Sequence, residues 1–267
     1  MNNVCTKDVT AYLDSIAPMG MKLEFDNVGH LVGRREAEVH RVLVALDITA
    51  DVIDEAAQQG AELIVAHHPL IFKPRTHVTD ADGTGQKLIR LIRHDIGAIC
   101  MHTNLDAAVG GVNDVLAEAV GLEDPEILWH VGETGGVPYG LGRVGELSAR
   151  QAMPAFLAHV KQAVGATGLR YHDAGRPVHR VAVMGGSGSD ALDMAVAAEC
   201  DTYVLGEAKY SAFLAAKEQG INLIEADHFC TENLVSAPLA QKIAAQFPAL
   251  AVMVSKRLGQ TAQFYIG

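Results

Sequence analysis

An internal repeat constrains the fold of this chain more than any other feature. In the first half, the strand-like run 44–49 is followed by a helix-like stretch and then by the apolar run 63–68. In the second half, residues 183–188 and 202–207 reproduce this order at the same spacing, without a gap. A pattern that occurs only twice indicates a duplicated lobe and not a solenoid. We therefore expect two similar α/β lobes related by internal duplication.

A second match between the halves consists of a histidine with an acidic residue four positions later. His102 and Asp106 in the first half correspond to His228 and Glu232 in the second. Their offset is shorter than that of the other matched runs, so the first copy carries an extra loop after His68. Both halves thus bring histidine and carboxylate groups to strand ends, and such groups are typical ligands of a metal site.

Apolar strand-like runs and helix-like stretches alternate along the first half. Strands are expected at residues 42–46, 63–66 and 98–101, with helices at 50–59 and 86–94. This alternation predicts largely parallel sheets with crossover helices.

The domain organisation follows from the repeat and from one irregular segment. Residues 124–144 show little periodicity and contain several glycines. We therefore expect a first α/β lobe at 1–125, a connection at 126–145 and a second α/β lobe at 146–267, with a C-terminus that can pack back on the first lobe. The length of 267 residues suits one large domain or two lobes.

Charge and cysteine usage limit the possible partners and compartments. The net charge of −11 repels polyphosphate backbones and disfavours nucleic-acid binding, and no cluster of Lys and Arg in the sequence indicates a basic pocket. The four cysteines form no C-x-x-C pair. The N-terminus lacks the pattern of a signal peptide, and no apolar run approaches the roughly 20 residues needed to span a bilayer. We expect a cytoplasmic protein without a membrane partner.

The pair His67-His68 is the sharpest local signal for a site. It ends an apolar strand and precedes Pro69, which cannot continue the ladder. Ligands of open α/β sheets bind at the carboxyl ends of strands, and beyond the last ladder hydrogen bond both imidazoles can turn toward one place. The alternative is one buried structural histidine and one surface histidine.

The two His-to-acid steps also allow more than one interpretation. On a helix, His228 and Glu232 lie on one face, one turn apart. They can instead belong to a capping arrangement in which Asp227 or Thr231 is the N-cap. Asp106 can complete a His-rich site, or form an Asx-turn or a helix N-cap. His102 is a candidate ligand, a partner that orients Asp106, or a proton shuttle.

Three other features have simpler explanations. The segment 185–189 resembles a phosphate-cradling turn but lacks the lysine of a P-loop, so a tight strand-to-helix turn is the more economical interpretation. Asp26 and Asp47 are typical of turns. Cys230 lies beside the candidate ligands without a nucleophile signature, which indicates a packing residue.

Taken together, these motifs resemble the NIF-three-like family of dinuclear-metal-centre hexameric proteins, often labelled GTP cyclohydrolase I type 2 homologues. The matching segments span nearly the whole chain in the family's order. They are Phe25-Asp26-Asn27-Val28-Gly29, His67-His68-Pro69-Leu70-Ile71-Phe72, His102-Thr103-Asn104-Leu105-Asp106, Gly111-Val112-Asn113-Asp114, Gly185-Gly186-Ser187-Gly188, Gly206-Glu207 and His228-Phe229-Cys230-Thr231-Glu232. The short segment between the halves resembles the compact members of the family.

The resemblance implies two metal ions per subunit, in a site that we expect between the lobes. The family's ligand positions fall on His67, His68, Asp106, His228 and Glu232. The resemblance further implies a toroidal homo-hexamer whose metal sites face an interior cavity. Mixed nitrogen and carboxylate ligands suit Zn, Mn, Fe or Ni better than Mg or Ca.

Such a site predicts a metal-dependent hydrolase that acts on a nucleotide-like or other phosphate-bearing small molecule; the GTP cyclohydrolase type 2 label follows from the resemblance. Five ligands leave coordination positions open for water and substrate. We expect Glu232 to bridge the ions and His102 to transfer protons. The alternatives are a metal storage or delivery ring and a metal-stabilised scaffold or regulatory protein.

Overall fold

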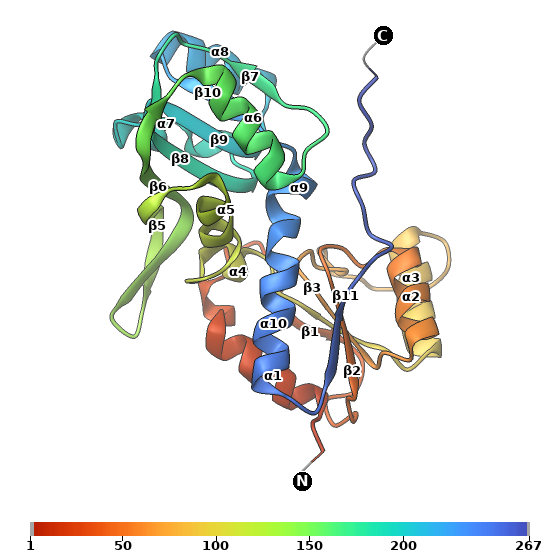
Figure 1. The fold of residues 1–267 in the computed structure, drawn as a ribbon. Coiled ribbons are helices and arrows are strands. Elements are labelled where there is room, and N and C mark those ends of the chain that lie inside the picture. The colour runs from red at the N-terminus through yellow and green to blue at the C-terminus, as the bar shows by residue number, and fades with distance from the viewer. Residues whose placement is uncertain (1–2, 266–267) are drawn as a thin grey trace. The chain divides into compact units, whose positions relative to one another are not determined.

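The computed structural model describes residues 3–265 and divides the chain into two compact units (Figure 1). Unit 1 comprises Met1–Leu105 and Val235–Gly259, and unit 2 comprises Asp106–Leu234 and Gln260–Gly267. The chain therefore leaves unit 1 between Leu105 and Asp106 and returns to it between Leu234 and Val235. Each unit is an α/β structure with its own sheet, which confirms the expected fold class.

Unit 1 is built around a five-stranded sheet with the strand order β1-β4-β3-β2-β11. Its elements are α1 (Thr6–Ile16), η1 (Met19–Met21), β1 (Gly29–Val32), β2 (Arg41–Ala45), α2 (Ala50–Gln59), β3 (Leu63–Ala66), α3 (Gly83–Arg93), β4 (Gly97–Cys100), α10 (Ser236–Gln246) and β11 (Ala251–Val254), while α4 (Thr103–Ala107) and η3 (Asn233–Val235) contain the two crossing points. Strands β4, β3, β2 and β11 are parallel, and β1 joins the edge of the sheet in the antiparallel direction.

Local sequence explains the first crossover in unit 1. The residues of β3 are buried on both faces of the sheet, as expected for a parallel strand covered by helices. The Thr49 side chain caps α2 by accepting from the Val52 N–H, and Gly60 ends the helix in the left-handed conformation with φ of 65°. In Figure 1, α2 and α3 lie on one side of this sheet and α1 and α10 on the other. The carboxyl edge of β2, β3 and β4 carries the site described below.

A buried carboxylate fastens the C-terminal part of unit 1 to α2. Glu55 accepts hydrogen bonds from the Ser255 hydroxyl and from the N–H groups of Lys256 and Arg257, directly after β11. Burial by itself raises the pKa of Glu55, but these hydrogen bonds outweigh it and hold the pKa below its usual value. An ionised Glu55 therefore stabilises the packing of β11 beside β2.

We expect Glu55→Ala to lower the free energy of unfolding of unit 1 by about 1–3 kcal/mol, because three hydrogen-bond donors lose their buried acceptor. Since the folded-state pKa is depressed, this contribution is present above the unfolded pKa of about 4.3 and is lost as the pH falls below it. Urea titrations of both proteins at pH 7 and pH 3.5 measure the difference. An equal difference at both pH values would contradict the role of the ionised carboxylate.

Unit 2 contains a six-stranded sheet with the strand order β5-β6-β8-β9-β10-β7. Its elements are α5 (Val112–Val120), β5 (Glu123–Thr134), β6 (Val137–Gln151), α6 (Met153–Val164), β7 (Arg170–His172), β8 (Val178–Ser187), η2 (Ser189–Ala191), α7 (Leu192–Ala197), β9 (Thr202–Glu207), α8 (Tyr210–Gln219), β10 (Asn222–Glu225) and α9 (His228–Glu232). The run β8-α7-β9-α8-β10 matches β2-α2-β3-α3-β4 of unit 1, and in both units an antiparallel strand flanks the last of these strands. The repeat found in the sequence is thus a repeated topology.

The second sheet is mixed, because only β8, β9 and β10 run parallel to one another. The low periodicity of the sequence predicts a connection at 126–145, but the chain forms the long antiparallel strands β5 and β6 there. Gly135 and Gly136 join them with φ of 56° and 81°, the left-handed pair that a two-residue hairpin turn requires. The glycines that resemble a linker in the sequence therefore form a hairpin turn.

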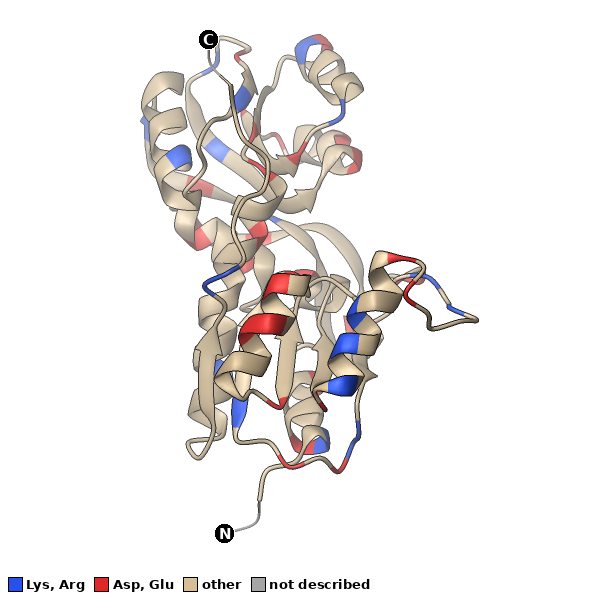
Figure 2. Cartoon of the chain, turned by 90° about the vertical axis from the view of Figure 1, so that its right-hand side faces the viewer, with Lys and Arg blue, Asp and Glu red and all other residues tan. Residues whose placement is uncertain are grey.

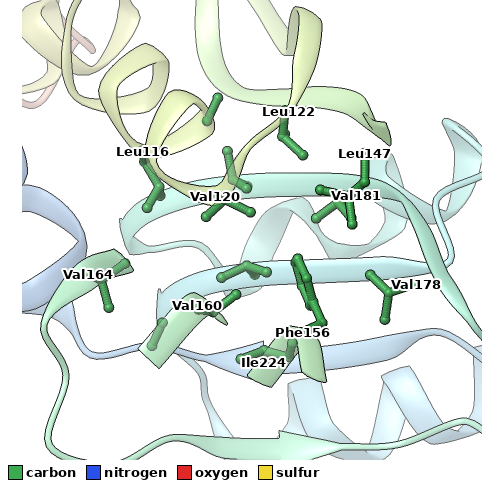
Figure 3. Packing of buried hydrophobic residues seen from close by; sticks show 14 of the residues in the cluster. Leu116, Val120, Leu122, Leu147, Phe156, Val160, Val164, Val178, Val181 and Ile224 are labelled. Carbon is green, nitrogen blue, oxygen red and sulfur yellow. The ribbon is translucent and has the colours of Figure 1, made fainter. Parts of the chain in front are cut away.

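The boundary between the units also differs from the expected position near residue 125. Helix α5 belongs to unit 2, because it packs on β6 and β8. Figure 3 shows the resulting core, in which Leu116 and Val120 of α5 and Phe156 and Val160 of α6 cover the sheet. Cys230 is buried in the same core, and desolvation raises the pKa of its thiol to about 12, as befits a packing residue.

No helix within residues 3–265 has both the length and the apolar character needed to cross a membrane.

Candidate metal centre

Three histidines meet at the carboxyl edge of the sheet of unit 1. His67 and His68 directly follow β3, and His102 follows the neighbouring strand β4. One ring nitrogen from each lies within 4.8 Å of one from each of the others. The ring centroids are 4.9 Å apart for His67 and His68, 5.2 Å for His67 and His102, and 5.5 Å for His68 and His102. His67 is buried, and His68 and His102 are half-buried.

Hydrogen bonds at Nδ1 set the protonation of all three rings. His67 Nδ1 lies 2.7 Å from the carbonyl oxygen of Met101. His68 Nδ1 lies 2.8 Å from Asp47 Oδ1, and His102 Nδ1 lies 2.8 Å from Asp26 Oδ1. Since a carbonyl or carboxylate oxygen only accepts, each Nδ1 must carry the proton and donate. Each Nε2 then keeps a lone pair, which is the tautomer that binds metals in carboxylate–histidine–metal arrangements.

Asp26 is the most constrained of these acceptors. Its side chain is fully buried, and its second oxygen accepts from the Thr103 N–H at 3.0 Å and from the Thr103 hydroxyl. Burial alone raises the pKa of Asp26, yet the hydrogen bonds from His102 and Thr103 outweigh it and hold the pKa far below its usual value. Asp26 is therefore ionised at neutral pH and orients the ring of His102.

In unit 2, α9 carries a histidine and a carboxylate on one face, as the spacing predicts. His228 Nε2 lies 3.1 Å from Glu232 Oε2, and His228 Nδ1 lies 3.2 Å from Glu207 Oε2. Asp227 caps the same helix by accepting from the Cys230 N–H. The capping arrangement and the His-acid face, which the sequence leaves as alternatives, are thus present together.

Asp106 belongs to the same part of unit 2. One of its carboxylate oxygens lies within 4.8 Å of one from Glu232. Its backbone is held by Asn113, whose side-chain amide donates to the Asp106 carbonyl at 2.9 Å and accepts from the Gly185 N–H at 3.0 Å. Two carboxylates this close repel each other when both are ionised, and a cation between them relieves that repulsion.

The glycine-rich end of β8 makes room for the Glu232 carboxylate. A Cβ atom on Gly186 would lie 2.0 Å from Glu232 Oε1, and Gly186 has φ of 65°. The Gly186 N–H donates to the Thr231 hydroxyl at 3.3 Å, so this amide and that of Gly185 are bonded within the protein. The segment 185–189 is the irregular end of β8 and the start of η2, and its glycines shape the carboxylate site. This agrees with the interpretation as scaffold geometry and not as a phosphate cradle.

Sequence reasoning did not find the two aspartates that orient the histidines. Asp47 and Asp26 both resemble turn residues in the sequence. In the structure, Asp47 accepts a hydrogen bond from His68, and Asp26 accepts one from His102. A signal for Asp47 does exist in the sequence, because it lies two residues after the end of β2, as His68 lies two residues after the end of the neighbouring parallel strand β3. For Asp26 no local signal exists, since it reaches His102 from a distant part of the chain.

The donors fit a divalent transition metal. Imidazole nitrogens with fixed tautomers and nearby carboxylates match the ligands that Zn, Mn, Fe and Ni accept. The fold and these side chains define a class of protein: two duplicated α/β units with groups of His, Asp and Glu residues that could hold a metal ion. The chain belongs to the Duf34/NIF3 (NGG1p interacting factor 3) family, whose model matches residues 4–258.

Comparison with individual proteins agrees with this assignment. A protein of Clostridium perfringens named GTP cyclohydrolase 1 type 2 homolog is 35% identical over 237 residues, which cover 88% of this chain and 90% of that protein. A crystal structure of Staphylococcus aureus hypothetical protein SA1388 is similar over 99% of this chain and 100% of its own, with 29% identity and a TM-score of 0.91. A Bacillus cereus protein related to NIF3 shares the fold, with 24% identity, the same coverage and a TM-score of 0.93.

Proposed function

We propose that this protein is a hydrolase that uses two divalent metal ions and acts on a nucleotide-like or other phosphate-bearing small molecule. The proposed ligands are His67, His68, Asp106, His228 and Glu232. His102 is proposed as the group that transfers protons.

The observation that carries the proposal is that the three histidines of unit 1 share one hydrogen-bonding pattern and one tautomer. All three use Nδ1 for a hydrogen bond to an oxygen, so each keeps an Nε2 lone pair. In a metal site, a hydrogen bond at Nδ1 orients each ligand ring and raises its basicity, as it would for His67 and His68 here.

Chain connectivity supports the assignment of donors from both units to one dinuclear centre. Asp106 is the first residue of unit 2 and lies in the short helix α4, which begins directly after His102. Glu232 lies two residues before the last residue of unit 2 ahead of the return to unit 1. The position of the centre between the lobes is part of the proposal.

The residues of the chain have distinct roles in this proposal. When bound, divalent ions supply Lewis acidity and make water a better nucleophile near neutral pH. His102 accepts and returns a proton at Nε2, while the buried Asp26 carboxylate holds its ring in position through the hydrogen bond at Nδ1. Asp47 and the Met101 carbonyl hold the His68 and His67 rings in position. Five ligands leave room for substrate to approach the ions.

Two further points of the proposal rest on relatives. The curated relatives carry the name GTP cyclohydrolase 1 type 2 homolog, which agrees with a nucleotide-like substrate. A homo-hexamer in the form of a toroid is proposed from the family resemblance; size-exclusion chromatography with light scattering would measure it.

Metal-loaded protein tests the function in assays with a panel of nucleotides, GTP included, followed by chromatographic detection of any product. We expect turnover in the wild type and none in Glu232→Ala. His102→Asn should keep its metal while turnover falls by about 10²–10⁴-fold, as expected on loss of a general acid–base group. His159→Ala is the matched control, because His159 bonds a backbone carbonyl at a distance from these residues in the sequence.

The alternatives give different results in the same experiment. Tightly held metal without turnover on any substrate, together with a large fall in melting temperature on chelation, would replace the hydrolase by a metal-stabilised scaffold. Rapid exchange of bound metal without turnover would indicate storage or delivery of metal.

A further inference from the structure

A cavity of about 430 Å³ opens beside His68 at the carboxyl edge of the sheet of unit 1. This volume lies within the range of about 300–1,000 Å³ that is typical of small-molecule sites. Three segments form its wall: the loop after β2, the loop after β3 and the first turns of α3. The lining residues are Asp47, Ile48, Thr49, His68, Pro69, Leu70, Ile71, Phe72, Lys73, Arg75, Thr84 and Lys87.

The cavity is cationic although the chain as a whole carries a net charge of −11. Lys73, Arg75 and Lys87 line it, against one carboxylate, that of Asp47, which is bonded to His68. Within residues 3–265, no ion pair joins Lys73 or Lys87 to a carboxylate. Two lysines that share one cavity repel each other, and an anion bound between them removes that repulsion.

Arg75 is held in place in the wall of the cavity. Its guanidinium pairs with Asp82, which also caps α3 by accepting from the Gly85 N–H at 2.9 Å. This pairing joins the loop after β3 to the start of α3, the helix that carries Lys87. Figure 2 shows the Lys and Arg positions of this loop and helix in blue. No basic cluster is visible along the sequence, because these cations come from separate segments that meet only in the folded unit.

The remaining wall is apolar and leads to the histidines. Ile48, Ile71 and Phe72 line it, and the Phe72 ring lies 6.2 Å from the His102 ring in an edge-on arrangement. His68 belongs both to the histidine cluster and to the wall of the cavity. A molecule with an apolar or ring-shaped body and an anionic group can therefore contact Phe72 and the cations at once, and it then lies beside His68.

We propose that this cavity binds a phosphate ester through Lys73, Lys87 and Arg75, with the organic part of the ester against Phe72 and Ile71. Phosphate suits this wall because Lys and Arg donate charge-assisted hydrogen bonds to its oxygens, and Thr49 and Thr84 supply hydroxyl groups. The assignment deepens the proposed function, on which it rests for the role of the ester as substrate. The cations act as recognition groups, so their loss should raise KM more than it lowers kcat.

Binding can be tested separately from turnover. Phenyl phosphate is the probe and phenol is the control that lacks the phosphate, and their affinities are measured by ligand-observed NMR titration of the metal-loaded protein and of the chelator-treated protein. We expect saturable binding of phenyl phosphate only, in both forms of the protein. The variant Lys73→Gln/Lys87→Gln should bind it about tenfold more weakly or worse, because two charge-assisted contacts are lost.

A matched control removes the same charge elsewhere. Lys161→Gln/Lys217→Gln alters two exposed lysines of unit 2 and should leave the affinity unchanged. Absence of saturable binding to the wild type, or equal affinity in the two double variants, would overturn the proposal. Binding that disappears on chelation but persists in Lys73→Gln/Lys87→Gln would also overturn it, by assigning the phosphate to the metal. A protein that binds phenyl phosphate but hydrolyses nothing would refute the proposed function and leave the cavity assignment intact.

Discussion

His68→Ala, purified without added metal or chelator, is expected to contain far less divalent metal than the wild type, which should hold about two ions per subunit. The alanine removes a ring nitrogen whose lone pair is fixed by the Asp47 hydrogen bond. Water can replace the lost imidazole as a ligand, but it binds a divalent metal ion less strongly than the imidazole does. Metal content per subunit, measured by inductively coupled plasma mass spectrometry, gives the answer directly.

A graded series strengthens this measurement. Asp47→Asn keeps His68 but weakens control of its tautomer, and loss of such a partner typically costs about 10–100-fold in metal affinity. The expected order of affinity is therefore wild type, then Asp47→Asn, then His68→Ala. His159→Ala should retain the wild-type content. If His68→Ala folds normally and binds as much metal as the wild type, the histidine cluster is structural and the proposed centre is wrong.

Gly186→Ala is expected to abolish the contribution of Glu232 to the centre while unit 2 stays folded. The new Cβ would lie 2.0 Å from Glu232 Oε1, which is a severe steric clash, so one of the two atoms must move. The clashing atom, Glu232 Oε1, is at the end of a flexible side chain, so the carboxylate moves more readily than the backbone of residue 186. Metal content and turnover should fall as in Glu232→Ala, and the free energy of unfolding should fall by about 1–3 kcal/mol.

Gly220→Ala is the control that separates the effect of the steric clash at residue 186 from the effect of backbone strain. Gly220 has φ of 67°, close to the 65° of Gly186, but a Cβ there meets no atom within 4 Å. Both alanines pay a similar cost of about 1 kcal/mol for the left-handed conformation. Only Gly186→Ala should lose metal. Equal metal content in the two variants would show that the Glu232 carboxylate is not a ligand.

Several parts of the fold can be predicted from short-range patterns. The buried strands β2 and β3, the capped helix α2 and the end of α2 at Gly60 follow from apolar runs and from capping residues whose effects are local. The repeat predicts the duplicated topology, because two segments with the same order of apolar strand-like runs and helix-like stretches are expected to form the same order of strands and helices. The hairpin β5-β6 could also have been predicted from the sequence, since a Gly-Gly pair between two strand-like runs is a usual signal for a hairpin turn.

The residues that offer metal-binding chemistry can be recognised along the chain, because His67-His68 and the two His-to-acid steps are visible as spacings. The tautomers and orientations of these side chains depend on contacts that exist only in the folded protein. The bonds from Asp26 to His102 and from Asp47 to His68 join distant segments, and the space for Glu232 depends on Gly186 from another strand. The cationic cavity likewise assembles from Lys73 and Lys87 across a loop and a helix. Such long-range contacts depend on the packing of whole elements, which no local pattern of residues encodes.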